Sequence, residues 1–308
     1  MEIGFEIEDD DYNSTYTGPK KLKTSIADSY AYDKEDYRKA ITSDACKTAF
    51  NYSISHFAAD TIYNQNNISI VSEGLMVNKD DETILLMEAE NDTRGQIYLE
   101  TSKISINGLL VYGSEWSSDT INSGKRSIID VKLSNVLKNS FRDAFGIKDI
   151  GEIKLNIEIK NADGNVIVAD TPITVTISEN NVSFDKSGTN IYENNNISIV
   201  SKGVVGSDSD YDKDMYVLLM IENNSQDTVS IDNVYDSLSV NGVMTDYIFT
   251  SQTVEAGSCA MLEFDLSDSS LEDNKISQIS DIKSLEVKIE IEDSKGKEID
   301  SPTLKVTY

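Results

Sequence analysis

The segments "IYNQNNISIVSEG" (residues 62–74) and "IYENNNISIVSKG" (residues 191–203) are identical at 10 of 13 positions. A second pair of matching segments follows in the same order, "SINGLLV" (105–111) and "SVNGVMT" (239–245). One unit of about 117 residues therefore occurs twice along the chain. Because both copies carry the same pattern, we expect two consecutive domains with one fold.

Apolar and polar residues alternate within each unit. In "SLEVKIEIED" (284–293) every second residue from Leu285 to Ile291 is apolar, and the residues between them are charged. This period marks a strand with one buried and one solvated face. Asn107-Gly108 and Asn241-Gly242 tolerate the positive φ angles of a tight hairpin turn. The pattern predicts an all-β fold of tandem immunoglobulin-like β-sandwiches, with a barrel as the lesser alternative.

Each unit also contains a short helical insert. "LSNVLKNSFRDAFGI" (133–147) has apolar residues at helical spacing, and Ser134 is its expected N-cap. The corresponding "DSSLEDNKISQIS" (268–280) is shorter and more polar, so we expect one or two helical turns there.

The first residues of the chain resemble its last ones. "EIGFEIED" (2–9) matches "EVKIEIED" (286–293) at 5 of 8 positions. A proline lies 11–13 residues after the central isoleucine of each such strand, at Pro19, Pro172 and Pro302. Proline cannot donate to a strand ladder and so favours edge or terminal strands. We therefore expect an N-terminal hairpin that ends a truncated preceding repeat.

The two units and the segments around them give the expected domain organisation. Residues 28–60 match neither repeat and combine a helical pattern with a strand pattern, which predicts a mixed connector. The linker between the two repeats is polar and contains Gly188, so we expect limited contact between the two sandwiches. The segments are the terminal hairpin (1–27), the connector (28–60), repeat 1 (61–177), the linker (178–190) and repeat 2 (191–308).

The chain has a formal net charge of −27, and residues 191–308 hold 23 acidic but only 8 basic residues. Such a surface repels phosphate backbones, so nucleic acid is not an expected partner. No apolar run approaches the length of a membrane-spanning helix, so membrane insertion is not expected. The start of the chain lacks the pattern of a secretory signal. Cys46 and Cys259 provide neither a disulfide framework nor a zinc motif.

Catalytic groups are scarce. His56 is the only histidine, so the chain can form only one nucleophile–histidine arrangement. The candidate is a dyad of Cys46 and His56. A buried thiol and a partly exposed imidazole form the simpler interpretation. The carboxylates of "SLEVKIEIED" lie on one solvated strand face, unlike the facing carboxylates of a glycosidase. We expect no enzyme activity and no cofactor.

A weak calcium site is the alternative to a cofactor-free chain. The segment "DSDYDKD" has acidic residues at alternate positions, as in the first half of a calcium-binding loop. Lys213 stands where glycine makes the sharp turn of such a loop, and Leu219 stands where a bidentate glutamate closes it. A solvated acidic loop is therefore the simpler interpretation. The candidate Ca²⁺ ligands are Asp208, Asp210, Asp212 and Asp214.

Three aromatic residues, Trp116, Tyr30 and Tyr32, are candidates for contacting a ligand. Aromatic side chains often dominate binding surfaces. Trp116 aligns with Phe249 of the second unit, which favours a position in the core for both residues. Tyr30 and Tyr32 belong to a tyrosine-rich segment near the N-terminus.

The segment "LLMIENNSQDTVSIDNVYDSLSVNG" (218–242) resembles the uncharacterised immunoglobulin-like sandwich modules of secreted or lipid-anchored surface proteins of Gram-positive anaerobes. The likeness rests on "IENNS" followed by an alternating strand and "SVNG". It implies an extracellular or cell-surface location, no known enzyme activity and no functional residues to transfer. We expect a non-enzymatic module that binds a protein or glycan, or acts as a spacer. A calcium-dependent adhesive or carbohydrate-binding module is the alternative, and an enzyme using Cys46 and His56 ranks last. The pattern leaves the oligomeric state open.

Overall fold

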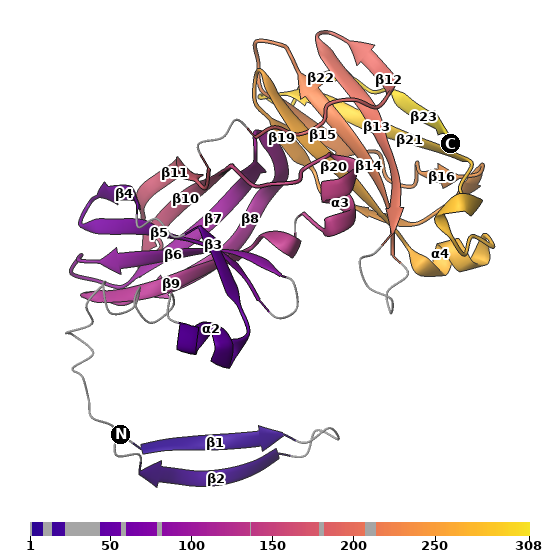
Figure 1. The fold of residues 1–308 in the computed structure, drawn as a ribbon. Coiled ribbons are helices and arrows are strands. Elements are labelled where there is room, and N and C mark those ends of the chain that lie inside the picture. The colour runs from indigo at the N-terminus through magenta and orange to yellow at the C-terminus, as the bar shows by residue number, and fades with distance from the viewer. Residues whose placement is uncertain are drawn as a thin grey trace. The chain divides into compact units, whose positions relative to one another are not determined.

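The computed structural model describes most of the chain, as drawn in Figure 1. The chain divides into two compact units, Met1–Ala49 and Phe50–Tyr308. The described residues are 2–8, 14–21, 44–56, 60–78, 82–135, 137–178, 182–206 and 214–308.

The first unit contains an antiparallel hairpin at the position where the sequence predicts one. Strand β1 (Glu2–Glu8) pairs with β2 (Ser14–Lys21), and Pro19 lies within β2. Farther along the chain, helix α2 (Asp44–Phe50) precedes β3 (Ser53–His56), the order expected for the connector. The origin of the hairpin in a truncated repeat stays a prediction.

The first sandwich consists of two sheets. One has the order β3-β5-β6-β9 with β4 also on β5, and the other has the order β11-β10-β7-β8. Inward side chains such as Met87, Leu99 and Ile157 are fully buried between them. The strands are β4 (Asp60–Gln65), β5 (Ile68–Val77), β6 (Thr83–Asn91), β7 (Ile97–Ile106), β8 (Leu109–Ile121), β9 (Lys125–Lys132), β10 (Glu152–Asn161) and β11 (Val166–Thr176).

The second sandwich repeats this plan. Strands β12 (Thr189–Asn194), β13 (Ile197–Gly206), β14 (Met215–Asn223) and β20 (Ser258–Leu266) form one sheet, and β18 (Tyr247–Phe249) pairs with β20. Leu219, Leu262 and Ile289 are fully buried in its core. The facing sheet contains β15 (Val229–Asn233), β16 (Ser239–Val240), β17 (Val243–Met244), β19 (Gln252–Val254), β21 (Ser284–Asp293), β22 (Glu298–Asp300) and β23 (Thr303–Thr307).

Strand pairings correspond between the two sandwiches. The ladder β4-β5-β6-β9 of the first matches β12-β13-β14-β20 of the second. In the facing sheets, β10 of the first sandwich lies between β7 and β11, and its counterpart β21 lies between β15 and β16 on one side and β22 and β23 on the other. The predicted all-β fold of tandem sandwiches is confirmed.

Asparagine fixes several turns. Asn107 and Gly108 have φ angles of 52° and 87°, and Asn241 and Gly242 have 53° and 79°, as a tight hairpin requires. The β4–β5 hairpin turns at Asn66-Asn67, where both φ angles are also positive. This Asn-Asn turn was not predicted from the sequence, although asparagine is one of the few non-glycine residues that tolerate the conformation.

Two buried asparagines hold equivalent loops and give the "IENNS" motif a physical reason. The Nδ2 group of Asn223 donates hydrogen bonds to the carbonyl oxygens of Asp227 and Val254, both at 2.9 Å. Its Oδ1 atom accepts bonds from the N–H and hydroxyl of Ser225, at 3.1 and 2.6 Å. Asn91 holds the corresponding loop of the first sandwich through a matching set of contacts. Both asparagines are fully buried, so the motif locks a loop against the sandwich core.

The first helical insert is shorter than expected, whereas the second has the expected length of one or two turns. A 3-10 turn, η1 (Leu133–Asn135), precedes helix α3 (Asn139–Ala144), and α4 (Asp268–Asp273) precedes a second 3-10 turn, η2 (Ile279–Asp281). The predicted N-cap at Ser134 is wrong, because Ser134 lies inside η1 and Lys138 occupies the N-cap position of α3. The N–H of Leu137 donates to the Leu133 carbonyl at 2.8 Å, and this separate turn buries both leucines before the helix starts.

Candidate functional site

The expected limited contact between the sandwiches is wrong, because one sheet continues through both. Leu109 and Leu110 of β8 pair in parallel with Cys259 and Ala260 of β20, which creates a nine-stranded sheet. Leu109 is fully buried in the first core, and Leu110 packs against the second core. The residues after the Asn107-Gly108 turn therefore join the two sandwiches. We call this contact region the joint.

Helix α3 supplies the aromatic part of the joint. The rings of Phe141 and Tyr216 meet edge to face, with centroids 5.2 Å apart. The Nζ atom of Lys138 lies 3.5 Å from the Tyr216 ring centroid, and the Lys202 Nζ atom lies 5.2 Å from that of Phe145. Cations over aromatic faces and edge-to-face rings are both favourable, so the two sandwiches are held by directional as well as apolar contacts.

The outer face of the β14–β20 sheet completes the joint. Leu218, Met220, Cys259 and Met261 are at most 3% exposed and belong to the same buried cluster as the core of the first sandwich. Burial raises the pKa of the Cys259 thiol, although the nearby Lys186 ammonium opposes the shift. The joint is thus an extension of a hydrophobic core. This explains why the two sandwiches are in contact although the linker between them is polar.

One carboxyl group beside the joint titrates near neutral pH. Burial raises the pKa of Glu263 to about 7; the charge of Lys138 opposes this change and that of Asp265 adds to it. Burial also raises the pKa of the Tyr216 hydroxyl, which donates a 2.9 Å hydrogen bond to the Asp214 carboxylate. Protonation of Glu263 therefore relieves an unfavourable buried charge.

The equivalent hairpin of the second sandwich is exposed. Val243 and Met244 of β17 follow Asn241-Gly242 as Leu109 and Leu110 follow Asn107-Gly108. Their side chains are 49% and 55% exposed, whereas Leu109 is fully buried. Tyr235 and Ile248 lie at the same end of the sandwich and are 87% and 70% exposed. We call these four side chains the β17 surface.

A groove of about 580 Å³ runs over the β17 surface, with Tyr235, Met244 and Ile248 in its lining. Its floor is ordered by packing, because the rings of Tyr247 and Phe249 lie with centroids 5.7 and 4.7 Å from that of buried Phe264.

Polar contacts fix the walls of the groove. The Tyr247 hydroxyl donates to the Val234 carbonyl at 3.1 Å and accepts from the Asn233 amide at 2.9 Å. The Ser270 hydroxyl donates to the Asp246 carboxylate at 2.9 Å. The groove therefore combines aromatic and apolar side chains with polar ones, and the acidic residues Asp236 and Asp246 are part of its lining.

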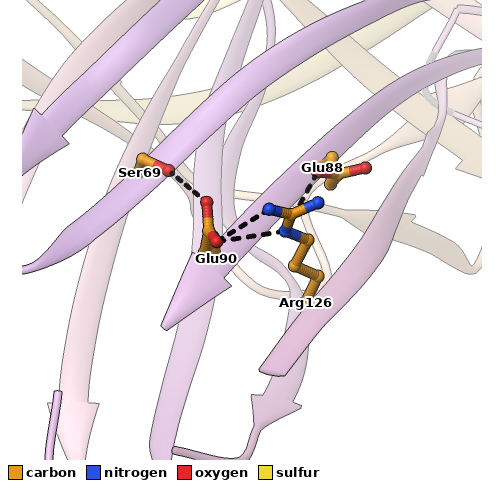
Figure 2. A network of polar contacts seen from close by, with 4 residues as sticks. All are labelled: Ser69, Glu88, Glu90 and Arg126. Carbon is orange, nitrogen blue, oxygen red and sulfur yellow. Dashed lines mark hydrogen bonds and ion pairs between the residues drawn. The ribbon is translucent and has the colours of Figure 1, made fainter. Parts of the chain in front are cut away.

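An ion-pair network lies on the outer face of the first sandwich (Figure 2). The Arg126 guanidinium of β9 contacts the Glu90 carboxylate of β6, with an Nη2–Oε1 distance of 2.9 Å. The same guanidinium lies 3.7 Å from Glu88, which is 2% exposed, and the Ser69 hydroxyl donates to Glu90 at 3.5 Å. The cation balances two acidic side chains at a covered position, so the network is structural in character.

The predicted calcium ligands lie almost entirely outside the described residues. Asp208, Asp210 and Asp212 are not described, and Asp214 accepts the Tyr216 hydrogen bond given above. Within the described part of the chain, no group of three or more His, Cys, Asp and Glu residues is arranged to hold a metal ion. The calcium site stays a prediction.

The other predicted site residues are not tested either. Tyr30 and Tyr32 lie outside the described residues, as do the side chains of Trp116 in β8, Cys46 in α2 and His56 in β3. The sequence did not predict the β17 surface, because Val243-Met244 and the aligned Leu109-Leu110 are equally apolar and differ only in what surrounds them. No helix among the described residues combines the length and apolar composition needed to cross a membrane.

Comparisons with known proteins give only distant likenesses. No family model and no curated protein matches the chain. Among solved structures, the exo-chitosanase CsxA of Amycolatopsis orientalis is similar at 9% identity with a TM-score of 0.22. The match covers 75% of this chain and 25% of that one, so this chain spans about a quarter of the chitosanase.

Two further solved structures show likenesses of the same size. A Porphyromonas gingivalis W83 protein of unknown function is 10% identical with a TM-score of 0.20, over 74% of this chain and 92% of that one. A structure from a 1.5-MDa bacterial ice-binding adhesin is 12% identical with a TM-score of 0.18, over 80% and 74%. Scores of this size do not assign the chain to a family.

Proposed function

We propose that the protein is a non-enzymatic extracellular surface module that binds a protein or glycan through the β17 surface. The observation that carries this proposal is the exposure of Tyr235, Met244 and Ile248 around one pre-formed groove. Contiguous apolar and aromatic exposure on a soluble fold is typical of interaction sites, because water contact with such a patch is unfavourable.

The joint supports a second part of this role, which is to space the binding surface from its attachment point. A sheet that continues from β8 into β20, together with the buried Phe141–Tyr216 contact, resists bending between the sandwiches. A stiff pair of domains presents its far end at a fixed distance, whereas flexible beads do not. Membership in the surface modules of Gram-positive anaerobes is part of the same proposal.

Binding is tested by probing glycan arrays and a panel of purified extracellular proteins with the labelled full chain. We compare the wild type with a Tyr235→Ala/Ile248→Ser variant and with a Val166→Ser control, since Val166 is 52% exposed on β11. The proposal expects at least one ligand whose binding the double variant loses and the control keeps. Equal binding by all three proteins, or no binding to any probe, contradicts it.

A further inference from the structure

Equivalent hairpins of the two sandwiches differ in what covers them. In the first, the strand after the Asn-Gly turn pairs with a strand of another sandwich. In the second, β17 lies at the end of its sheet, in the order β17-β16-β21-β15-β19. An exposed edge strand has backbone groups that can pair with another chain, and its apolar side chains favour such pairing.

Apolar exposure in the described part of the chain is concentrated at this edge. Four of its seven exposed large hydrophobic side chains form the β17 surface. The internal joint shows what kind of surface this hairpin position accepts, namely an edge strand of a sandwich with the same fold. A second copy of the chain supplies a different exposed edge strand of the same fold, its own β17, and this edge makes self-association possible.

A head-to-tail arrangement of copies does not fit the first sandwich. In the first sandwich the face of β6 and β9 corresponds to the β14–β20 face of the second. It carries Glu88 and Arg126 at the positions where the joint has Met220 and Cys259. That face is also covered, since Leu86 is 8% and Glu88 is 2% exposed. The first sandwich therefore has no apolar face on which β17 of another copy could pack in the way that β8 packs in the joint. The alternative is a two-fold contact, in which the same edge strand of each copy pairs with its equivalent in the other. Two-fold contacts are the commonest in soluble oligomers.

We infer that two copies of this chain form a two-fold dimer in which β17 of one copy pairs with β17 of the other. This inference rests on the proposed function of the β17 surface and names its partner. Val243 and Met244 of both copies would bury one another, with Ile248 and Tyr235 at the margin of the contact. The short edge and modest apolar area imply a weak dimer.

Charge gives the dimer a distinctive salt dependence. Each copy has a formal net charge of −27, and Asp236 and Asp246 line the groove beside β17. A two-fold contact brings these like charges together, so screening by added salt strengthens the dimer. A basic ligand at the same site would bind more weakly as salt rises.

Sedimentation velocity of the full chain tests the inference over a concentration series up to about 1 mM, which detects association as weak as roughly −4 kcal/mol. We measure the wild type at low and high NaCl, together with Met244→Lys, Ile248→Lys and the Val166→Lys control. All three substituted side chains are more than half exposed, so each variant should fold, and circular dichroism verifies this.

The expected result is a wild-type dimer of twice the monomer mass that becomes stronger at high salt. Met244→Lys should abolish it, Ile248→Lys should weaken it at least tenfold, and Val166→Lys should leave it unchanged. A wild type that stays monomeric throughout, or a Met244→Lys variant that dimerises like the wild type, overturns the inference. If the chain is monomeric yet loses array binding in the Tyr235→Ala/Ile248→Ser variant, only the dimer fails and the proposed function stands.

Discussion

Met220 and Met244 form a matched pair that measures how much the joint contributes to stability. Met220 is 2% exposed within the joint, whereas Met244 is 55% exposed on the β17 surface. Substitution of a buried methionine by alanine removes apolar contacts and leaves a cavity, at a cost of about 2–5 kcal/mol. The same change at an exposed position stays within about 0.5 kcal/mol. Met220→Ala should therefore lower the free energy of unfolding far more than Met244→Ala.

Cys259 reports on opening of the joint, because its side chain is only 3% exposed there. In a Cys46→Ser background, a thiol reagent labels Cys259 only when the joint or the whole fold opens. If reclosing is faster than labelling, the rate follows the opening equilibrium. A loss of about 2 kcal/mol then accelerates labelling roughly 30-fold.

The assay combines urea unfolding, followed by circular dichroism, with the Cys259 labelling rate in native buffer. Met220→Ala should shift the unfolding midpoint and accelerate labelling, and Met244→Ala should do neither. The reasoning is refuted if the two variants unfold alike and label Cys259 at the same rate, since Met220 would then contribute no more than a surface residue.

Three further predictions follow from particular side chains. The pKa of Glu263 is raised from 4.5 to about 7 in the folded protein, so its stabilising effect is complete below about pH 4.5 and lost as pH rises through 7. Glu263→Gln should remove this decline, worth about 1–3 kcal/mol, from a plot of unfolding free energy against pH; an unchanged slope contradicts the assignment. Asn223→Ala breaks the loop lock and should cost about 2–4 kcal/mol by urea unfolding, against almost nothing for exposed Asn224→Ala. Millimolar Ca²⁺ should leave the melting temperature unchanged, whereas a clear increase would favour the calcium-dependent alternative.

Local sequence patterns predict the strands and turns of this protein well. The alternation from Leu285 to Ile291 and the Asn-Gly pairs depend on neighbours along the chain, and the structure confirms both. The N-cap at Ser134 failed because burial of Leu133 and Leu137 in a separate turn outweighed the local capping preference.

The joint is harder to foresee, because it depends on what covers the outer face of a sheet. Strand β14 does carry a usable signal, since residues 215–221 are apolar without interruption, as expected for a strand buried on both faces. Its counterpart β6 is interrupted by Glu88 and Glu90. Exposure of β17 has no such local signal, because Val243-Met244 and Leu109-Leu110 are equally apolar and differ only in their surroundings.

Methionine oxidation tests most directly the claim that the joint is closed and the β17 surface open. We treat the chain at about 1 μM, a concentration at which a weak dimer is dissociated, with hydrogen peroxide and quantify sulfoxide in each peptide by mass spectrometry. Met244 should oxidise at least tenfold faster than Met220 and Met261, which are 2% and 1% exposed. Equal rates at the three methionines, or protection of Met244, would contradict the account.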